Sequence, residues 1–237
     1  MSNKHSRAAM AARHRRNMWL IWGGGAVVVA IAVVFAFVAS SGSDSGSSSA
    51  KGSKETAPVT VDGTSLPNYT GQGTDPAIGM TMPTLTGVSF DGKPVEITPN
   101  GKPQAIVFVA HWCPHCQAEV PRLVALAKTG TFQGVDVSAV ATGTNSGYPN
   151  YPPSSWLARE KWPFPVMVDS ATSTAAKAYG LTSYPYFVLI DANGKVAGRA
   201  SGEVASADVI ANMKALAAGQ PLPLASSGAS PSSSSSK

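Results

Sequence analysis

Hydrophobic positions divide the chain into one long uncharged run and a body of short apolar segments. The run, residues 18–39, reads MWLIWGGGAVVVAIAVVFAFVA and contains no charged side chain. As a helix rising ~1.5 Å per residue it is ~33 Å long, which is enough to cross a hydrocarbon core of ~30 Å. We therefore expect a transmembrane helix or signal anchor at 18–39. The alternative is a cleaved signal peptide, although the apolar part of such peptides is usually only ~7–15 residues long.

Short apolar runs separated by turn residues predict an α/β domain over residues 76–220. Strands are expected at 88–90, 95–97, 104–110, 134–141, 165–168, 186–191 and 195–200. Helices are expected at 114–128, at 154–161 with Ser154 as cap, at 170–179 and at 205–218. Val209, Ile210, Met213 and Leu216 form one apolar face of the last helix, and its Met and Leu residues should be core. Strands interleaved with helices indicate a mixed sheet with helices on both faces.

The remaining segments are polar. Residues 40–75 and 221–237 are rich in Ser, Gly and Pro and have few large apolar side chains, so they are predicted to be a flexible tether and a disordered tail. Residues 1–17 carry five of the 18 Lys and Arg residues. Basic flanks of a membrane span stay on the cytoplasmic side. We therefore expect a single-pass protein of the cell membrane, with a cytoplasmic segment at 1–17 and an extracytoplasmic C-terminal domain.

Charge and cysteine content exclude several classes of protein. Beyond residue 17 the other 13 basic residues balance the 13 acidic ones, and a neutral body argues against binding to nucleic acid. Cys113 and Cys116 are the only cysteines. Two cysteines make neither a disulfide-stapled scaffold nor an all-cysteine zinc site.

The two cysteines lie in the motif HWCPHC, residues 111–116, directly after a predicted buried strand. At this spacing their sulfurs are one helical turn apart and can close a redox-active disulfide. Amides at the start of a helix favour an anion, so Cys113 should provide the thiolate that attacks a disulfide. Cys116, one turn further along, should be more buried and act as the resolving thiol.

Longer motifs around the cysteines point to a family. The pattern WCxxCxxExPxL at 112–123, the upstream Met82-Pro83 and the proline of TSYPYF at 182–187 resemble thioredoxin-fold thiol–disulfide oxidoreductases of the membrane-anchored TlpA/ResA branch. The resemblance implies a thioredoxin-like mixed sheet flanked by helices. We expect no cofactor. The resemblance also implies that Glu119 relays protons to the thiols and that Pro185 follows a cis peptide bond. A cis bond there would leave the Tyr184 backbone free to pair with an extended substrate.

The dipeptide between the cysteines departs from that branch. Pro114-His115 is the dipeptide of the strongly oxidising periplasmic thiol oxidases of the DsbA type, and this resemblance implies that His115 stabilises the Cys113 thiolate. Those oxidases carry a long helical insertion, for which the 68 residues between Cys116 and Pro185 leave little room. The body thus resembles a reductase-like branch, whereas the dipeptide resembles an oxidase.

The favoured function is thiol–disulfide exchange with exported thiol or disulfide proteins, with a membrane redox partner that recycles the cysteine pair. The alternatives are a thiol reductase for haem attachment, a surface-anchored binding module, and a copper-handling protein in which His111 and His115 would join the two thiolates. A purely structural disulfide is disfavoured because its loop is very short. We expect no bound metal in the favoured reading.

Individual site residues also have simpler interpretations. Glu119 could be an exposed helix residue paired with Arg122, and Pro185 could be an ordinary trans turn proline. His111 fits a polar neighbour at the strand end better than a ligand or base. Trp112 is expected to pack and to line the substrate groove together with Pro114 and Tyr184. The aromatic and proline-rich loop at 148–153 is either a specificity element or only a connection.

Overall fold

The computed structural model describes residues 54–223 of the chain. The predicted cytoplasmic segment and membrane span, residues 1–39, lie outside the described residues, as does most of the predicted tail. Between residues 54 and 223, no helix is both long enough and apolar enough to cross a membrane.

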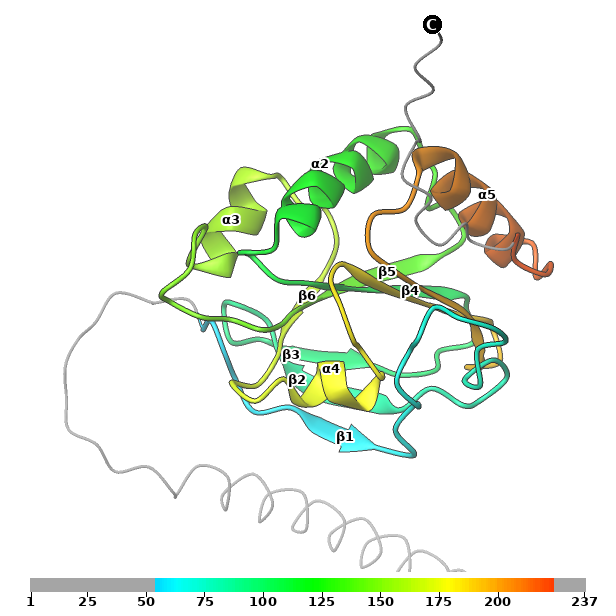
Figure 1. Ribbon diagram of the computed structural model, residues 1–237, viewed down its shortest axis with the longest axis horizontal. Coiled ribbons are helices and arrows are strands. Elements are labelled where there is room, and N and C mark those ends of the chain that lie inside the picture. Colours follow the sequence, from blue (N-terminus) through cyan, green and yellow to red (C-terminus); the bar gives the residue numbers. More distant parts are fainter. Residues whose placement is uncertain (1–53, 224–237) are drawn as a thin grey trace, which may run out of the picture. The chain divides into compact units, whose positions relative to one another are not determined.

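An eight-stranded mixed sheet forms the centre of the described domain (Figure 1). Its strands are β1 (Thr60–Asp62), β2 (Thr84–Val88), β3 (Pro94–Ile97), β4 (Gln104–Val109), β5 (Asp136–Ala141), β6 (Val166–Val168), β7 (Tyr186–Ile190) and β8 (Val196–Ser201). Their order is β1-β2-β6-β5-β4-β7-β8, with β3 also paired to β2. β4 is parallel to β5 and antiparallel to β7, so the sheet is mixed as expected.

Helices lie on both faces of this sheet (Figure 1). They are α2 (Pro114–Lys128), α3 (Pro153–Arg159), α4 (Thr174–Ala178) and α5 (Ser206–Ala217). The central strand β4 is buried along its whole length because both of its faces are covered. This arrangement is the thioredoxin-like mixed sheet with flanking helices that the motifs implied.

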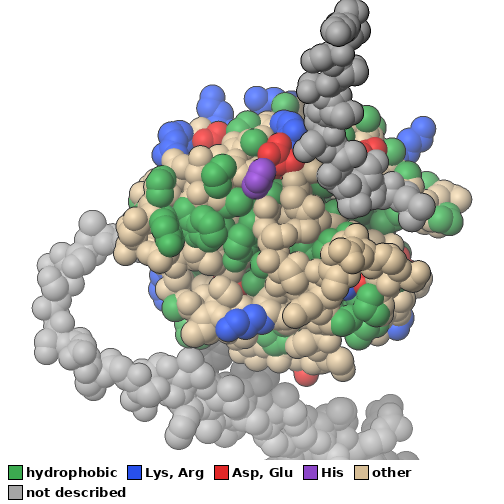
Figure 2. Space-filling model, viewed as in Figure 1, with side chains coloured by type: hydrophobic (Ala, Val, Ile, Leu, Met, Phe, Trp, Pro, Cys, Tyr) green, Lys and Arg blue, Asp and Glu red, His purple; other side chains and the backbone are tan. Residues whose placement is uncertain are grey.

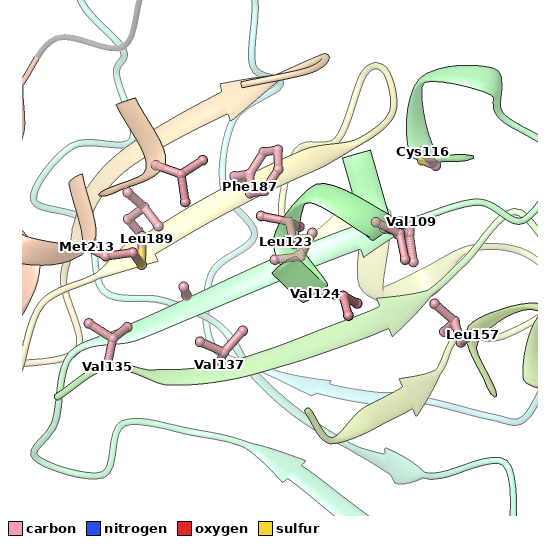
Figure 3. Packing of buried hydrophobic residues seen from close by; sticks show 14 of the residues in the cluster. Val109, Cys116, Leu123, Val124, Val135, Val137, Leu157, Phe187, Leu189 and Met213 are labelled. Atoms are coloured by element: carbon pink, nitrogen blue, oxygen red, sulfur yellow. The ribbon is translucent and has the colours of Figure 1, made fainter. Parts of the chain in front are cut away.

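Two hydrophobic clusters, one on each face of the sheet, account for the alternation along β4. Val107 and Val109 belong to the cluster on the side of α2 and α5, together with Leu123 and Met213. Figure 3 shows Val109, Leu123 and Met213 among the side chains of this cluster. Ile106 and Phe108 face the opposite side and pack with residues of α4 and of the N-terminal part of the domain. Cys116 belongs to the first cluster, so the resolving cysteine is part of the core.

The structure corrects the predicted tether at its C-terminal half. Residues 54–75 are part of the folded domain: β1 pairs with β2, and Leu66 is buried and donates its backbone N–H to the Ala178 carbonyl at 2.8 Å. Val59, Val61, Leu66 and Tyr69 all pack on the α4 face. Only Val59 and Val61 alternate, beside a strand of three residues, and the other apolar residues are scattered, which is why composition alone indicated a flexible segment.

Three smaller expectations also need correction. Ile210 is 46% exposed, because the buried face of α5 consists of Val209, Met213 and Leu216 and Ile210 lies outside it. Ser154 does not cap α3, which begins after Pro152; its hydroxyl donates to Glu55 instead. The helix expected at 170–179 begins only at Thr174, after a turn.

Candidate active site

Strand register brings the cysteine motif and Pro185 to the same end of the sheet. β4 and β7 are antiparallel, with Phe108 opposite Tyr186. The end of β4, which leads into the cysteine motif, therefore lies beside the start of β7, which follows Pro185. The Tyr184–Pro185 peptide bond is cis. The Cys113 thiol donates to the Tyr184 carbonyl over 3.8 Å. The two segments, 71 residues apart in sequence, thus form one site.

Cys113 occupies the N-cap position of α2. Its backbone is extended, with φ −74° and ψ 121°, and Pro114 follows in the first turn with its side chain exposed. The Gln117 N–H donates to the Cys113 carbonyl at 3.0 Å, which is the first bond of the helix. Both cysteines are free thiols, and Cys113 is 7% exposed. The sulfur therefore lies where the unpaired amides and dipole of α2 favour negative charge.

Cys116 lies behind Cys113 and is completely buried. Its sulfur accepts the Ala110 backbone N–H at 3.4 Å. Burial raises the pKa of the Cys116 thiol, and the nearby Cys113 and Glu119 raise it further by repulsion, which the bond from Ala110 offsets only in part. Cys116 is therefore protonated at neutral pH and needs a base to become a nucleophile.

Glu119 is the acidic group near Cys116. Its side chain is buried, not exposed as the simpler interpretation had it, although the expected pair with Arg122 is present through Oε2. Its other oxygen, Oε1, has no hydrogen-bond partner among the described residues. Burial raises the pKa of Glu119, and Arg122 opposes this shift. A buried carboxyl group with a raised pKa, close to a protonated thiol, can act as the base that takes the thiol proton.

His115 is on the surface, with a side chain 66% exposed, and it binds Glu203. Its Nδ1 lies 2.8 Å from Glu203 Oε1, while Glu203 Oε2 accepts a bond from Arg122 Nη2 at 2.8 Å. The hydrogen bond to His115 holds the pKa of Glu203 below its usual range. Sequence reasoning did not find Glu203, because it lies in the loop between β8 and α5 and belongs to no motif.

His111 is buried at the end of β4, and both of its ring nitrogens are occupied. Nε2 accepts the Asn145 backbone N–H at 3.3 Å, so the ring proton is on Nδ1, which donates to the Pro149 carbonyl at 2.7 Å. His111 is therefore a polar residue that ties the motif to the 143–153 loop. His115 Nδ1 binds Glu203, and neither imidazole has a described hydrogen bond to a cysteine sulfur. Among residues 54–223 no group of three or more His, Cys, Asp or Glu side chains is arranged to hold a metal ion.

Aromatic side chains border the other side of Cys113. Trp112 Nε1 donates to the Gly143 carbonyl at 2.8 Å, and its ring contacts Tyr148 and Tyr184 at centroid distances of 5.4 and 5.8 Å. Tyr148 is 52% exposed. A second cis bond, Tyr151–Pro152, lies in the same loop and was not predicted. The loop is thus attached to the motif through Trp112 and His111, and it presents aromatic surface beside the cysteines.

Comparison with known proteins agrees with this geometry. Residues 77–215, more than half of the chain, match the Redoxin family. The chain is 28% identical over 150 residues to the thiol-disulfide oxidoreductase ResA of Geobacillus thermodenitrificans, a match that covers 63% of this chain and 83% of the relative. It is 27% identical over 125 residues to the methylamine utilization protein MauD of Methylophilus methylotrophus, covering 51% of this chain and 54% of that protein.

Among solved structures, an uncharacterized conserved protein from Geobacillus kaustophilus superposes with a TM-score of 0.56 at 23% identity, over 72% of this chain and 92% of that one. This likeness concerns the fold, which is the arrangement described above. The family match spans the motif at 111–116 as well as Pro185. The chain belongs to the Redoxin family and is a thiol–disulfide oxidoreductase.

Proposed function

We propose that this protein exchanges disulfides with exported proteins outside the cytoplasm, held at the membrane by residues 18–39, and that a membrane redox partner recycles its cysteine pair. One observation carries the chemistry. Cys113 lies at the start of α2 within 3.8 Å of the Tyr184 carbonyl, and Cys116 is buried directly behind it. A two-step exchange needs a nucleophile that contacts the substrate and a second thiol that the substrate does not reach.

In the reducing direction, the Cys113 thiolate attacks one sulfur of a client disulfide, and the other client sulfur leaves as a thiolate. Glu119 then takes the proton of Cys116, and the Cys116 thiolate attacks the Cys113 sulfur of the mixed disulfide. This step releases the client dithiol and leaves the Cys113–Cys116 disulfide, so two electrons pass to the client. Oxidation of a client dithiol is the same sequence in reverse, with Glu119 returning the proton to Cys116.

The client is proposed to bind as an extended segment along Tyr184 and Pro185. In the free protein the Tyr184 carbonyl accepts only the weak bond from the Cys113 thiol among the bonds described, so it is available to a backbone N–H of the client. Trp112, Tyr148 and Tyr184 form an aromatic wall at one side of this segment. We assign to this wall the contact with the client side chain next to the reacting cysteine.

The test is a trapping experiment. The Cys116→Ala protein, expressed with its full N-terminus, should accumulate mixed disulfides with exported clients, because Cys113 can attack but nothing resolves the product. Cys113→Ala is the matched control and should trap almost none. If Cys116→Ala traps no client while its Cys113 still reacts with a small disulfide, the proposed function is wrong.

The proposed location has its own test. Alkaline phosphatase, which is active only after export, is fused after residue 220 of the full chain. High phosphatase activity is expected, together with recovery of the fusion in the membrane fraction. An inactive fusion of normal abundance would place the domain inside the cytoplasm and contradict the proposal.

A further inference from the structure

Four ionisable side chains from two elements form a continuous chain of contacts beside the cysteine pair. His115, Glu119 and Arg122 project from α2, and Glu203 comes from the loop after β8. Glu203 is the link between the two ends, since one of its oxygens is 2.8 Å from His115 Nδ1 and the other 2.8 Å from Arg122 Nη2. In Figure 2 the purple histidine surface adjoins acidic side chains in red and basic ones in blue.

The backbone around Glu203 is fixed independently of its side chain. The N–H of Gly202, the preceding residue, donates to the Pro185 carbonyl at 2.8 Å. The hydroxyls of Ser201 and Ser183 lie 2.6 Å apart. The loop that carries Glu203 is thus held against the Pro185 segment. A change confined to the Glu203 side chain should leave this loop in place.

The Glu203 carboxylate changes how His115, when protonated, acts on the Cys113 thiolate. An isolated imidazolium near the thiolate stabilises the reduced form of the pair, and a pair with a more stable reduced form is a stronger oxidant. An imidazolium with a carboxylate at 2.8 Å acts at longer range as a dipole, whose field falls off faster than that of a single charge. The cysteine pair should therefore be a weaker oxidant than the Pro-His dipeptide alone would indicate.

We propose that Glu203 is a positioning residue of the redox site: it binds His115, compensates its charge, and makes the Cys113–Cys116 disulfide less oxidising than the Pro-His dipeptide alone would make it. The inference rests on the proposed function and deepens it. It gives a physical reason why a body of the ResA type can carry the dipeptide of an oxidase.

The test measures the equilibrium of the Cys113–Cys116 pair with reduced and oxidised glutathione. Glu203→Ala should shift this equilibrium about fivefold toward the reduced protein, which corresponds to a potential about 20 mV more oxidising. Glu203→Gln, which keeps the shape and removes the charge, should shift it in the same direction. The double variant His115→Ala/Glu203→Ala, which removes both members of the pair, should stay within about twofold of the wild-type equilibrium. Asp208→Asn, which changes a carboxylate in the first turn of α5 outside this chain of contacts, is the control and should leave the equilibrium unchanged.

Each other outcome is decisive. A wild-type protein that exchanges with glutathione, combined with a Glu203→Ala variant of unchanged potential, overturns the inference and leaves the proposed function standing. A double variant that stays as far shifted as Glu203→Ala alone also overturns it, because the charge of His115 would then have no part in the effect. If the wild-type pair does not exchange with glutathione at all, the proposed function fails first and the inference with it.

Discussion

Replacing Glu119 by Gln should separate the two chemical steps of disulfide exchange. The attack by Cys113 has no need of Glu119, whereas the attack by Cys116 requires loss of a proton from a buried thiol. Even a thiol with the ordinary pKa of 9.0 is only ~1% ionised at pH 7, and burial lowers that fraction further for Cys116. A positioned general base typically accelerates such a step ~10²–10⁴-fold. Resolution of the mixed disulfide should therefore slow at least ~10²-fold in Glu119→Gln.

Rapid mixing with a disulfide-bonded peptide, acid quenching and non-reducing gels would resolve the two steps. The mixed disulfide should form at the wild-type rate in Glu119→Gln and then persist. In the wild type its resolution should speed up as the pH rises through the pKa of Glu119, and this limb of the pH profile should disappear in the variant. Glu96→Gln, an exposed carboxylate on β3, is the isosteric control. Equal slowing of both steps, or of neither, would refute the role given to Glu119.

Two further predictions concern the surroundings of the site. Asp75→Ala leaves the fully buried Arg199 side chain without its carboxylate, which should cost ~3 kcal/mol and lower Tm by ~6–12 °C, against little change for the exposed Asp62→Ala. Burial alone would raise the pKa of Asp75, but its hydrogen bond to Arg199 holds the pKa below 3.8. The stability that this pair contributes is therefore present above about pH 4 and is lost as the pH falls through the lower pKa of the folded state. Urea titrations in which Asp75→Ala loses the same free energy of unfolding at pH 3 as at pH 7 would contradict this. Tyr148→Ala removes half-exposed aromatic surface and should slow exchange ~3–10-fold with peptides that carry an apolar residue beside the cysteine. Peptides with a charged residue there should be affected much less, and equal slowing of both kinds would argue against the aromatic wall.

Elements with strong local signals could be placed from the sequence almost to the residue. The helix expected at 114–128 matches α2, because Pro114 suits a first turn and apolar spacing runs through to Lys128. The strand expected at 104–110 is β4 at Gln104–Val109, a continuous apolar run buried on both faces. The cis bond before Pro185 was implied only through the family motif, since a proline in a turn does not by itself reveal its isomer.

Features that depend on contacts between distant residues could not be placed in the same way. α4 begins late because the Asp169 carboxylate binds the backbone N–H groups of Ala175 and Ala176 from outside the helix. Glu203 reaches His115 across 88 positions of sequence, and only the folded sheet brings the two together. Residues 54–75 join the domain through the short strand β1, scattered apolar side chains and the Asp75–Arg199 pair, and the alternation around β1 is too short to stand out in a polar segment.

The unequal exposure of the two cysteines has a consequence for covalent labelling. Of the two cysteines only Cys113 has solvent-accessible surface, because Cys116 is enclosed by the core. A bulky maleimide added to the reduced enzyme would modify one sulfur and stop there, so a fluorophore or cross-linker can be placed at this position without removing the second cysteine. By the same logic, a single electrophile suffices to inactivate the enzyme, since the enclosed thiol cannot displace a thioether.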